Sequence, residues 1–287
     1  MYMPHHRPGP GQAARRRRGA WIVAGAALLL LGHEPGLGAE IRVDLVDYHD
    51  GATALQGYLA YDDSLGVERR PALLIAPEWR GLDDYAKSRA RQFAALGYLA
   101  FALDPYGKGV VVASDADAKS RSALLKADRT LLRARGRAAL DALLTQPLAA
   151  RDSIAAIGYC FGGTLVLELA RSGADIRAAI AVHGGLAAGT DAKGVPLPAQ
   201  TGVVTAKIMA LQGGDDPFVT QAELTAFTDE MRAAKVDWQL MEFGGAVHAF
   251  SNPHAGSDPS SGRAYNAVAD HRSMDIICHF LADLFPR

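Results

Sequence analysis

The sequence predicts an α/β fold, in which a mostly parallel central sheet carries helices on both faces and an antiparallel hairpin comes first. From residue 40 onward, short apolar runs alternate with longer segments of helical periodicity. Several of the runs are apolar throughout, which is typical of strands buried on both faces. The 287 residues, of which 49% are hydrophobic and 21% charged, suit one large globular domain and argue against disorder.

Strands are predicted where apolar runs are short or alternate with polar residues at a period of two. The first two strands form the hairpin, because Asp50 and Gly51 between them are typical turn residues. Pro71–Ala76 (PALLIA) is a continuous apolar run and indicates a buried strand. In chain order the predicted strands are residues 41–48, 54–61, 71–76, 98–103, 153–159, 177–182, 207–211 and 238–243.

Helices are predicted where apolar residues recur every three or four positions. Residues 85–96 form the first helix, which Gly97 ends. Residues 120–144 are expected to form one long amphipathic helix, with Leu124 and Leu131 on its apolar face. The remaining helices are residues 161–171, a helix that carries Leu224, Phe227 and Met231 after the capping-box pair Thr220 and Glu223, and a final helix with the stripe Met274, Ile277, Leu281 and Leu284.

Residues 1–39 have the pattern of a signal peptide. A basic stretch, Arg15–Arg18, precedes an apolar run from Ala20 to Leu31, and small residues follow at Gly38 and Ala39. The run is too short for a membrane-spanning helix, which needs about 20 residues. We expect cleavage near residue 39, a single domain over residues 40–287, and a periplasmic or secreted protein. An uncleaved anchor is the alternative.

Charge and cysteine content narrow the classes of function. Thirty Lys and Arg face 31 Asp and Glu, so no basic face for nucleic acid is expected. The two cysteines exclude a disulfide framework and a Cys-rich metal site. We expect no metal, no cofactor and no membrane association once the signal is removed. A monomer or loose homo-oligomer is expected.

The motif that points to chemistry is Gly158-Tyr159-Cys160-Phe161-Gly162-Gly163, directly after a predicted strand. A nucleophile between glycines at a sharp strand-to-helix turn is raised above the edge of the sheet. At a helix N-terminus, the helix dipole favours a Cys160 thiolate. The amide of Phe161 is then placed to stabilise an oxyanion. The alternative is a small buried cysteine on a glycine-rich turn.

A nucleophilic thiol needs a base, and the base needs an acid to orient it. In this fold the chain order is nucleophile, acid, histidine. Asp216 and His248 each follow a predicted strand and fit that order, so we expect His248 to be the base and Asp216 its orienting acid. Asp215 competes with Asp216 for this role. His183 also follows a strand, but it precedes the acid and is expected in the pocket.

The three motifs together resemble the dienelactone hydrolase family, a branch of the α/β-hydrolases, from about Arg70 to the C-terminus. The resemblance implies an α/β-hydrolase fold and a Cys160–His248–Asp216 triad. A further match, Ala76-Pro77-Glu78-Trp79, implies that Glu78 contacts the resting thiol and gates its ionisation. It also implies that the amide of Trp79 is the second oxyanion donor.

Two arginines that the family uses to hold a substrate carboxylate are missing. One is expected in residues 104–109, where Lys108 is the substitute and Tyr106 a candidate pocket residue. The other is expected a few residues after the histidine, where Phe250 stands in a stretch without Arg. The predicted substrate-binding residues are therefore Tyr106, Lys108, His183 and Phe250.

The predicted function is hydrolysis of a carboxylic ester or lactone, as in carboxymethylenebutenolidase, through a covalent acyl-enzyme and without a cofactor. The substrate is expected to be a small molecule. Two other functions remain open: a non-catalytic binding protein with the same fold, and a thiol-redox protein that uses Cys160.

Overall fold

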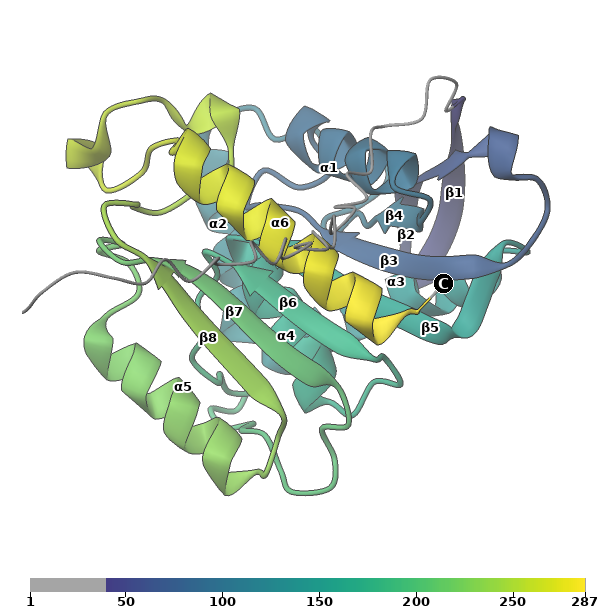
Figure 1. Ribbon diagram of the computed structural model, residues 1–287. Coiled ribbons are helices and arrows are strands. Elements are labelled where there is room, and N and C mark those ends of the chain that lie inside the picture. The colour runs from purple at the N-terminus through teal and green to yellow at the C-terminus, as the bar shows by residue number, and fades with distance from the viewer. Residues whose placement is uncertain (1–39, 287) are drawn as a thin grey trace, which may run out of the picture. The chain divides into compact units, whose positions relative to one another are not determined.

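The computed structural model describes residues 40–286, so the predicted signal peptide lies outside the described residues. The centre is an eight-stranded sheet in the order β1-β2-β4-β3-β5-β6-β7-β8 (Figure 1). The β1–β2 and β2–β4 pairs are antiparallel, and the other pairs are parallel. The strands are β1 (Ile41–Asp50), β2 (Thr53–Asp62), β3 (Arg70–Ala76), β4 (Leu99–Ala102), β5 (Ala149–Tyr159), β6 (Ala178–Val182), β7 (Lys207–Gly213) and β8 (Trp238–Phe243).

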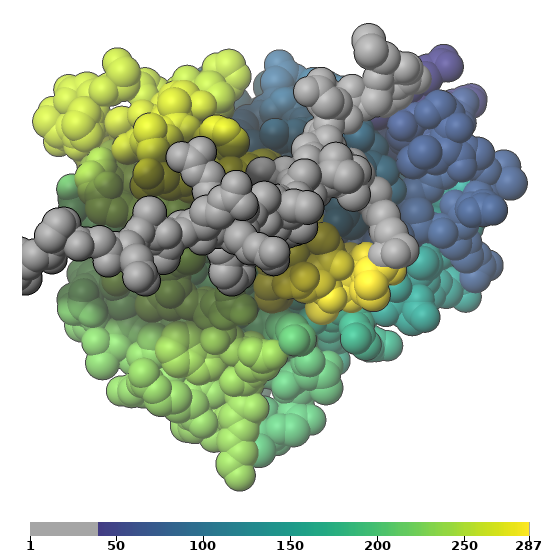
Figure 2. Space-filling model, in the orientation of Figure 1, coloured from purple at the N-terminus to yellow at the C-terminus, as the bar shows by residue number. Residues whose placement is uncertain are grey.

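Helices cover both faces of the sheet, which confirms the predicted fold class and its N-terminal hairpin. The helices are α1 (Asp84–Ala95), α2 (Asp115–Ala127), α3 (Arg129–Leu144), α4 (Phe161–Arg171), α5 (Gln221–Ala233) and α6 (Ala267–Leu284). In Figure 2 the blue atoms of the N-terminal strands and the green atoms of the C-terminal strands and α5 lie on opposite sides of the face shown.

Each face of the sheet has its own hydrophobic core. Leu74 of β3 packs in the core that includes α3, α4 and α5, whereas its neighbours Leu73 and Ile75 pack in the core that includes α1 and α6. Side chains alternate between faces along a strand, so a continuous apolar run is required where both faces are covered. This is the physical reason that the PALLIA run forms a central strand.

The single helix predicted over residues 120–144 is wrong, because the chain forms two helices that meet at Asp128. This residue has extended backbone angles (φ −127°, ψ 96°), and its carboxylate accepts the amide N–H groups of Thr130 and Leu131. Asp is a preferred N-cap, and it starts α3 afresh. The change of direction leaves Leu124 68% exposed and Leu131 37% exposed instead of turning both inward.

The carboxyl ends of β3, β5, β7 and β8 lead into the segments that carry the candidate functional residues. Parallel strands end at the same edge of a sheet, so these segments meet there. Within residues 40–286, none of the helices has the length and apolar character that crossing a membrane requires.

Close packing between β3 and the start of α4 predicts the effect of one substitution. A Cβ at Gly162 would lie 2.2 Å from the carbonyl oxygen of Ala76, whereas a Cβ at Gly244 would meet nothing within 4 Å. We expect Gly162→Ala to lower the free energy of unfolding by roughly 1–3 kcal/mol, because backbone must move to admit the methyl group. Denaturant unfolding measures this, with Gly244→Ala as the tolerated control. Equal stability of the two variants would contradict the packing argument.

Candidate active site

Cys160 occupies the sharp turn between β5 and α4. Its backbone lies at φ 51° and ψ −115°, a conformation that residues other than glycine rarely adopt. Gly158 permits the turn, because a Cβ there would lie 2.0 Å from the carbonyl oxygen of Gly162. The strained turn holds the thiol at the N-terminus of α4, where it is partly exposed.

His248 and Asp216 complete a continuous chain of hydrogen bonds to this thiol. The Nε2 atom of His248 lies 3.0 Å from Sγ of Cys160, and its Nδ1 atom lies 2.8 Å from Oδ2 of Asp216. The other carboxylate oxygen of Asp216 accepts the amide N–H of Phe218 at 2.8 Å. Asp216 is buried and Asp215 is exposed, so the geometry assigns the contact with the histidine to Asp216.

The charges around His248 favour its protonated form. Burial disfavours an imidazolium, but a Cys160 thiolate on one side and the Asp216 carboxylate on the other outweigh this and raise the pKa of His248 to about 10. Because the carboxylate can only accept, Nδ1 donates to Asp216 and Nε2 donates to the sulfur. The arrangement is suited to an imidazolium–thiolate pair.

A second histidine, His183, lies next to His248, and its pKa is shifted in the opposite direction. The ring of His183 is 5.4 Å from that of His248, and burial together with that neighbouring positive charge lowers the pKa of His183 well below its ordinary value. Its Nδ1 atom accepts the amide N–H of Cys160 at 3.1 Å, and its Nε2 atom lies 2.7 Å from Oγ of Ser251. A neutral His183 therefore stabilises the turn at Cys160 by accepting its amide hydrogen bond.

Glu78 lies at the end of β3, close to these groups, but it is not hydrogen-bonded to the thiol. Its Oε2 atom accepts from the side-chain amide of Asn252 at 2.7 Å, and its Oε1 atom lies 4.0 Å from Nε2 of His183. Burial raises the pKa of Glu78. The sulfur of Cys160 is instead paired with His248, so this arrangement differs from the resting contact implied for Glu78.

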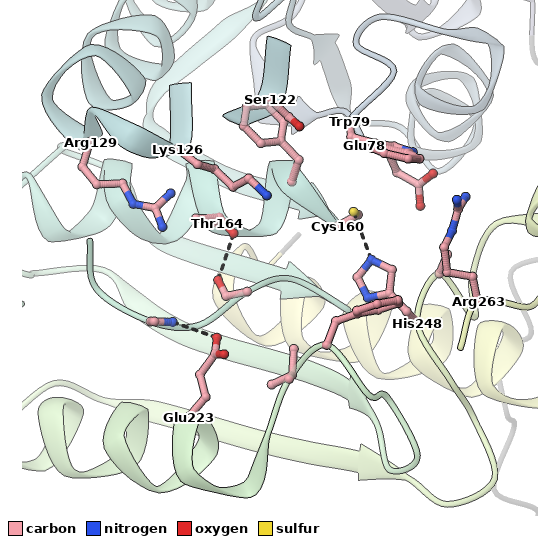
Figure 3. A pocket seen from close by; sticks show the side chains of 16 residues that line it. Glu78, Trp79, Ser122, Lys126, Arg129, Cys160, Thr164, Glu223, His248 and Arg263 are labelled. Carbon is pink, nitrogen blue, oxygen red and sulfur yellow. Dashed lines mark hydrogen bonds between the residues drawn. The ribbon is translucent and has the colours of Figure 1, made fainter. Parts of the chain in front are cut away.

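A cavity of about 510 Å³ opens above the thiol (Figure 3). Glu78, Trp79, Cys160, Phe161 and His248 all line it. The backbone amides of Phe161 and Trp79 have no acceptor among the described residues, as an oxyanion site requires. The cavity thus brings a thiol, an imidazole and two backbone amide N–H groups together.

Two of the side chains predicted to bind substrate are buried beneath the cavity. His183 and Phe250 have no exposed surface, and their rings lie 5.1 Å apart in a T-shaped contact. Phe250 also packs against Phe243 of β8. Neither ring can touch a molecule in the cavity, because the chain after His248 turns inward and uses Phe250 as part of the core.

The other two residues predicted to bind substrate, Tyr106 and Lys108, do not line the cavity. The hydroxyl of Tyr106 donates to the carbonyl oxygen of Trp79 at 2.7 Å, and its ring stacks on Phe161, so Tyr106 supports the cavity wall from behind. Lys108 forms a surface ion pair with Asp47 of the hairpin at 2.5 Å. Lys108 therefore does not take the place of the missing arginine.

Several lining residues were not predicted from the sequence, notably Lys126, Arg129 and Arg263. The guanidinium of Arg263 lies 5.1 Å from the centre of the Trp79 ring, and its backbone forms a parallel bridge with His248. Fourteen residues of loop and short 3-10 turns separate it from His248, so no periodicity or motif signals its position. Across residues 40–286, no group of three or more His, Cys, Asp or Glu side chains is arranged to hold a metal ion.

Comparisons with known proteins place this site in a family. A family model, the dienelactone hydrolase family, matches residues 55–285. A probable 2-oxo-3-(5-oxofuran-2-ylidene)propanoate lactonase from Bradyrhizobium sp. is 30% identical over 216 residues, which cover 73% of this chain and 84% of that protein. Protein K02A2.1 of Caenorhabditis elegans is 35% identical over 155 residues, covering 54% of this chain and 94% of that protein.

A solved structure supports the same family assignment. The dienelactone hydrolase-like promiscuous phosphotriesterase P91 from metagenomic libraries is 40% identical, with a TM-score of 0.79 over 86% of this chain and 100% of that chain. The match to the family model spans the sheet except β1 and the first two residues of β2, together with every segment that carries a cavity residue. The chain therefore belongs to the dienelactone hydrolase family and is a hydrolase with the α/β-hydrolase fold.

Proposed function

We propose that the chain hydrolyses carboxylic esters or lactones through a covalent acyl-enzyme on Cys160. The observation that carries this is the unbroken Cys160–His248–Asp216 chain, with contacts of 3.0 and 2.8 Å, beneath an open cavity. Similarity to a lactonase from Bradyrhizobium sp. supports the same class of substrate. Backbone strain of the kind found at Cys160 clusters at functional sites, which also supports the proposal.

In the first half-reaction the Cys160 thiolate attacks the carbonyl carbon and a C–S bond forms. The carbonyl oxygen becomes an oxyanion, which the free amides of Phe161 and Trp79 stabilise. The tetrahedral intermediate then collapses, the C–O bond to the alcohol breaks, and the Nε2 proton of His248 passes to the leaving oxygen. The products are a thioester on Cys160 and the free alcohol.

In the second half-reaction water replaces the alcohol. Neutral His248 removes a proton from the water as it attacks the thioester carbonyl, and collapse breaks the C–S bond. The carboxylic acid leaves, and the imidazolium–thiolate pair is restored. Asp216 holds the ring in the tautomer that both steps need. Burial raises the pKa of Glu78, which lies near this pair at the end of β3.

We also propose that the protein is exported and loses residues 1–39. Support comes from the basic stretch Arg15–Arg18 and the apolar run that follows it. Expression in a Gram-negative host followed by N-terminal sequencing of the periplasmic protein tests this, and the mature chain is expected to begin near Glu40. Leu29→Asp interrupts the apolar run and should keep the chain in the cytoplasm. An uncut N-terminus in the wild-type protein would contradict export with cleavage.

The acyl-enzyme makes a direct prediction. With 4-nitrophenyl acetate, we expect a burst of nitrophenolate and the mass gain of one acetyl group on Cys160. Cys160→Ala should lower kcat/KM at least about 1,000-fold, because no other group can replace the nucleophile. Peroxide consumption with a thiol reductant but without ester turnover would favour the redox alternative. Ligand binding without turnover of any ester or lactone would favour the binding protein.

The two adjacent aspartates allow a matched comparison. Asp216→Asn should lower kcat by roughly three to four orders of magnitude, because an amide cannot hold His248 in the required tautomer. Asp215→Asn, one residue earlier and exposed, should leave kcat within about twofold of the wild-type value. Steady-state kinetics on one ester measure both. Similar losses in the two variants would mean that Asp216 does not orient the base.

The charge balance predicts a shift in the titration of His248. The pKa of about 10 depends on the negative sulfur, so Cys160→Ser should lower it and make His248 neutral at a pH where the wild-type ring is still charged. NMR titration of the ring measures this, with His248→Gln to assign the signal. The Asp215→Asn variant should keep the wild-type pKa. An unchanged pKa in Cys160→Ser would show that no thiolate faces the ring.

A further inference from the structure

Ser251 lies three residues after His248 and is buried, but it does not line the cavity. Its Oγ atom lies 2.7 Å from Nε2 of His183 and 2.7 Å from the hydroxyl oxygen of Tyr85. A hydroxyl donates one hydrogen and accepts through two lone pairs, so it can link two neighbours in a chain. Ser251 therefore connects the loop that carries His248 to His183, directly after β6, and to Tyr85 of α1.

The direction of each hydrogen bond in this chain is fixed. Because Nδ1 of His183 accepts the amide N–H of Cys160, the neutral ring carries its hydrogen on Nε2 and donates it to Ser251. Ser251 then donates to Tyr85, whose hydroxyl donates to the carbonyl oxygen of Ser251 at 3.2 Å. The Tyr85 oxygen also accepts from Nε of Arg89 at 3.1 Å. Every hydrogen in the chain thus has an acceptor.

Arg89 of α1 anchors the chain to the rest of the fold. Its guanidinium pairs with Asp270 of α6 and donates to the carbonyl oxygen of Ser251 at 2.6 Å. Arg89, Tyr85 and Ser251 are all buried. A buried polar network whose members all have partners is rigid. The chain therefore reaches from two helices on one face of the sheet to the backbone of the turn at Cys160.

Backbone strain gathers at the two segments that the chain joins. Four non-glycine residues in the described part of the sequence have a positive φ, and three of them are Cys160 (51°), His183 (42°) and Ala249 (58°). Ala249 directly follows His248. Such conformations persist only where neighbouring contacts determine them. The chain through Ser251 supplies contacts at both segments, because it links the Cys160 amide to the loop after His248.

Without the hydroxyl of Ser251, the ring of His183 has another acceptor within reach. Oε1 of Glu78 is buried without a hydrogen-bond partner among the described residues, and it lies 4.0 Å from Nε2 of His183. A ring that moved toward this oxygen would release the amide N–H of Cys160, which also lies 3.0 Å from the carbonyl oxygen of Val182. The turn would then lose its link to the loop of Ser251.

We infer that Ser251 and Tyr85 are positioning residues. Through His183, their hydroxyls keep the loop of His248 and the turn of Cys160 in register. This inference rests on the proposed function, because it concerns the 3.0 Å contact between Nε2 of His248 and the sulfur of Cys160. Proton transfer depends on that distance. Neither hydroxyl lines the cavity, so the effect falls on the reacting groups and not on substrate binding.

Two variants and two matched controls test the inference. Ser251→Ala and Tyr85→Phe each remove one hydroxyl of the chain, whereas Ser273→Ala and Tyr48→Phe remove similarly buried hydroxyls that contact only backbone groups. With 4-nitrophenyl acetate, we expect the chain variants to lower kcat about 10- to 100-fold and to keep KM within about threefold, because a shift of about 1 Å at the reacting groups is costly. The controls should keep kcat within about twofold. Equal kcat values in Ser251→Ala and Ser273→Ala would overturn the inference.

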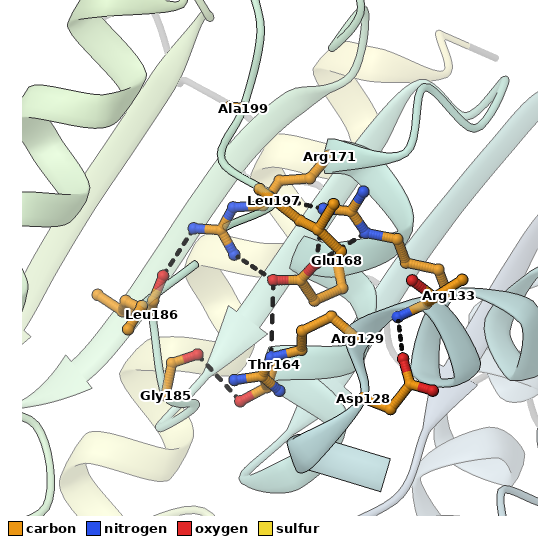
Figure 4. Close-up of polar contacts among 12 residues, drawn as sticks. Asp128, Arg129, Arg133, Thr164, Glu168, Arg171, Gly185, Leu186, Leu197 and Ala199 are labelled. Carbon is orange, nitrogen blue, oxygen red and sulfur yellow. Dashed lines mark hydrogen bonds and ion pairs between the residues drawn. The ribbon is translucent and has the colours of Figure 1, made fainter. Parts of the chain in front are cut away.

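A control on the other face of the sheet separates positioning from a general loss of stability. Arg133 of α3 donates to the buried carboxylate of Glu168 at 2.8 Å, and Glu168 also pairs with Arg171 at 3.2 Å (Figure 4). Arg133→Gln breaks a buried ion pair, so it should lower the denaturant midpoint at least as much as Ser251→Ala. Its kcat should stay within about threefold of the wild-type value. A loss of kcat as large as in Ser251→Ala would mean that activity follows stability, and would overturn the inference.

The double variant tests whether the two hydroxyls act as one chain. Combining Ser251→Ala with Tyr85→Phe should lower kcat no more than about twofold beyond the larger single loss, because either change alone breaks the chain. Losses that multiply would show two independent effects and contradict it. If Tyr85→Phe does not fold, Ser251→Ala, which keeps the carbonyl contact with Arg89, decides the matter against Ser273→Ala.

Alkylation of Cys160 keeps the test independent of ester chemistry. Iodoacetamide reacts with the thiolate, and mass spectrometry follows the modification at Cys160. We expect alkylation about tenfold slower in Ser251→Ala and Tyr85→Phe than in the wild-type protein, because the imidazolium is no longer held beside the sulfur. Ser273→Ala should keep the wild-type rate. If the wild-type protein turns over no ester, the proposed function fails, and these rates still decide the inference: equal rates in all the variants would overturn it.

Discussion

The site depends on one constraint, the tight turn that fixes Cys160 between β5 and α4. The turn combines a left-handed backbone at a residue with a side chain and backbone contacts that only glycine permits at Gly158 and Gly162. Such strain persists only where the surroundings determine the conformation. Here β3 supplies them, since Ala76 packs against the first turn of α4 and leads directly into Glu78 and Trp79. The positions of the Cys160 thiol and of the Trp79 amide therefore depend on the same contact between β3 and α4.

The two histidines show how burial alone does not determine a titration. His183 and His248 are both buried, and their rings are 5.4 Å apart. His248 faces two anionic groups and has a raised pKa. His183 is hydrogen-bonded to a backbone amide and a hydroxyl, and burial together with the charge of His248 lowers its pKa although Glu78 lies 4.0 Å away. The difference suits their positions, because two imidazoliums at this distance would repel each other. A neutral ring behind a charged one can brace the turn without weakening the imidazolium–thiolate pair.

Sequence reasoning predicted the residues whose position follows from the sheet. Cys160, Asp216 and His248 each come shortly after a parallel strand, so topology brings them to one edge. It could not predict where side chains on irregular loops point, which is why Phe250 was expected in the cavity and is in the core. The position of Arg129 beside the cavity was not predicted, for a different reason. The helical periodicity of residues 120–144 predicted one continuous helix, so the N-cap at Asp128 was missed. This cap places Arg129 at the start of α3, beside the cavity.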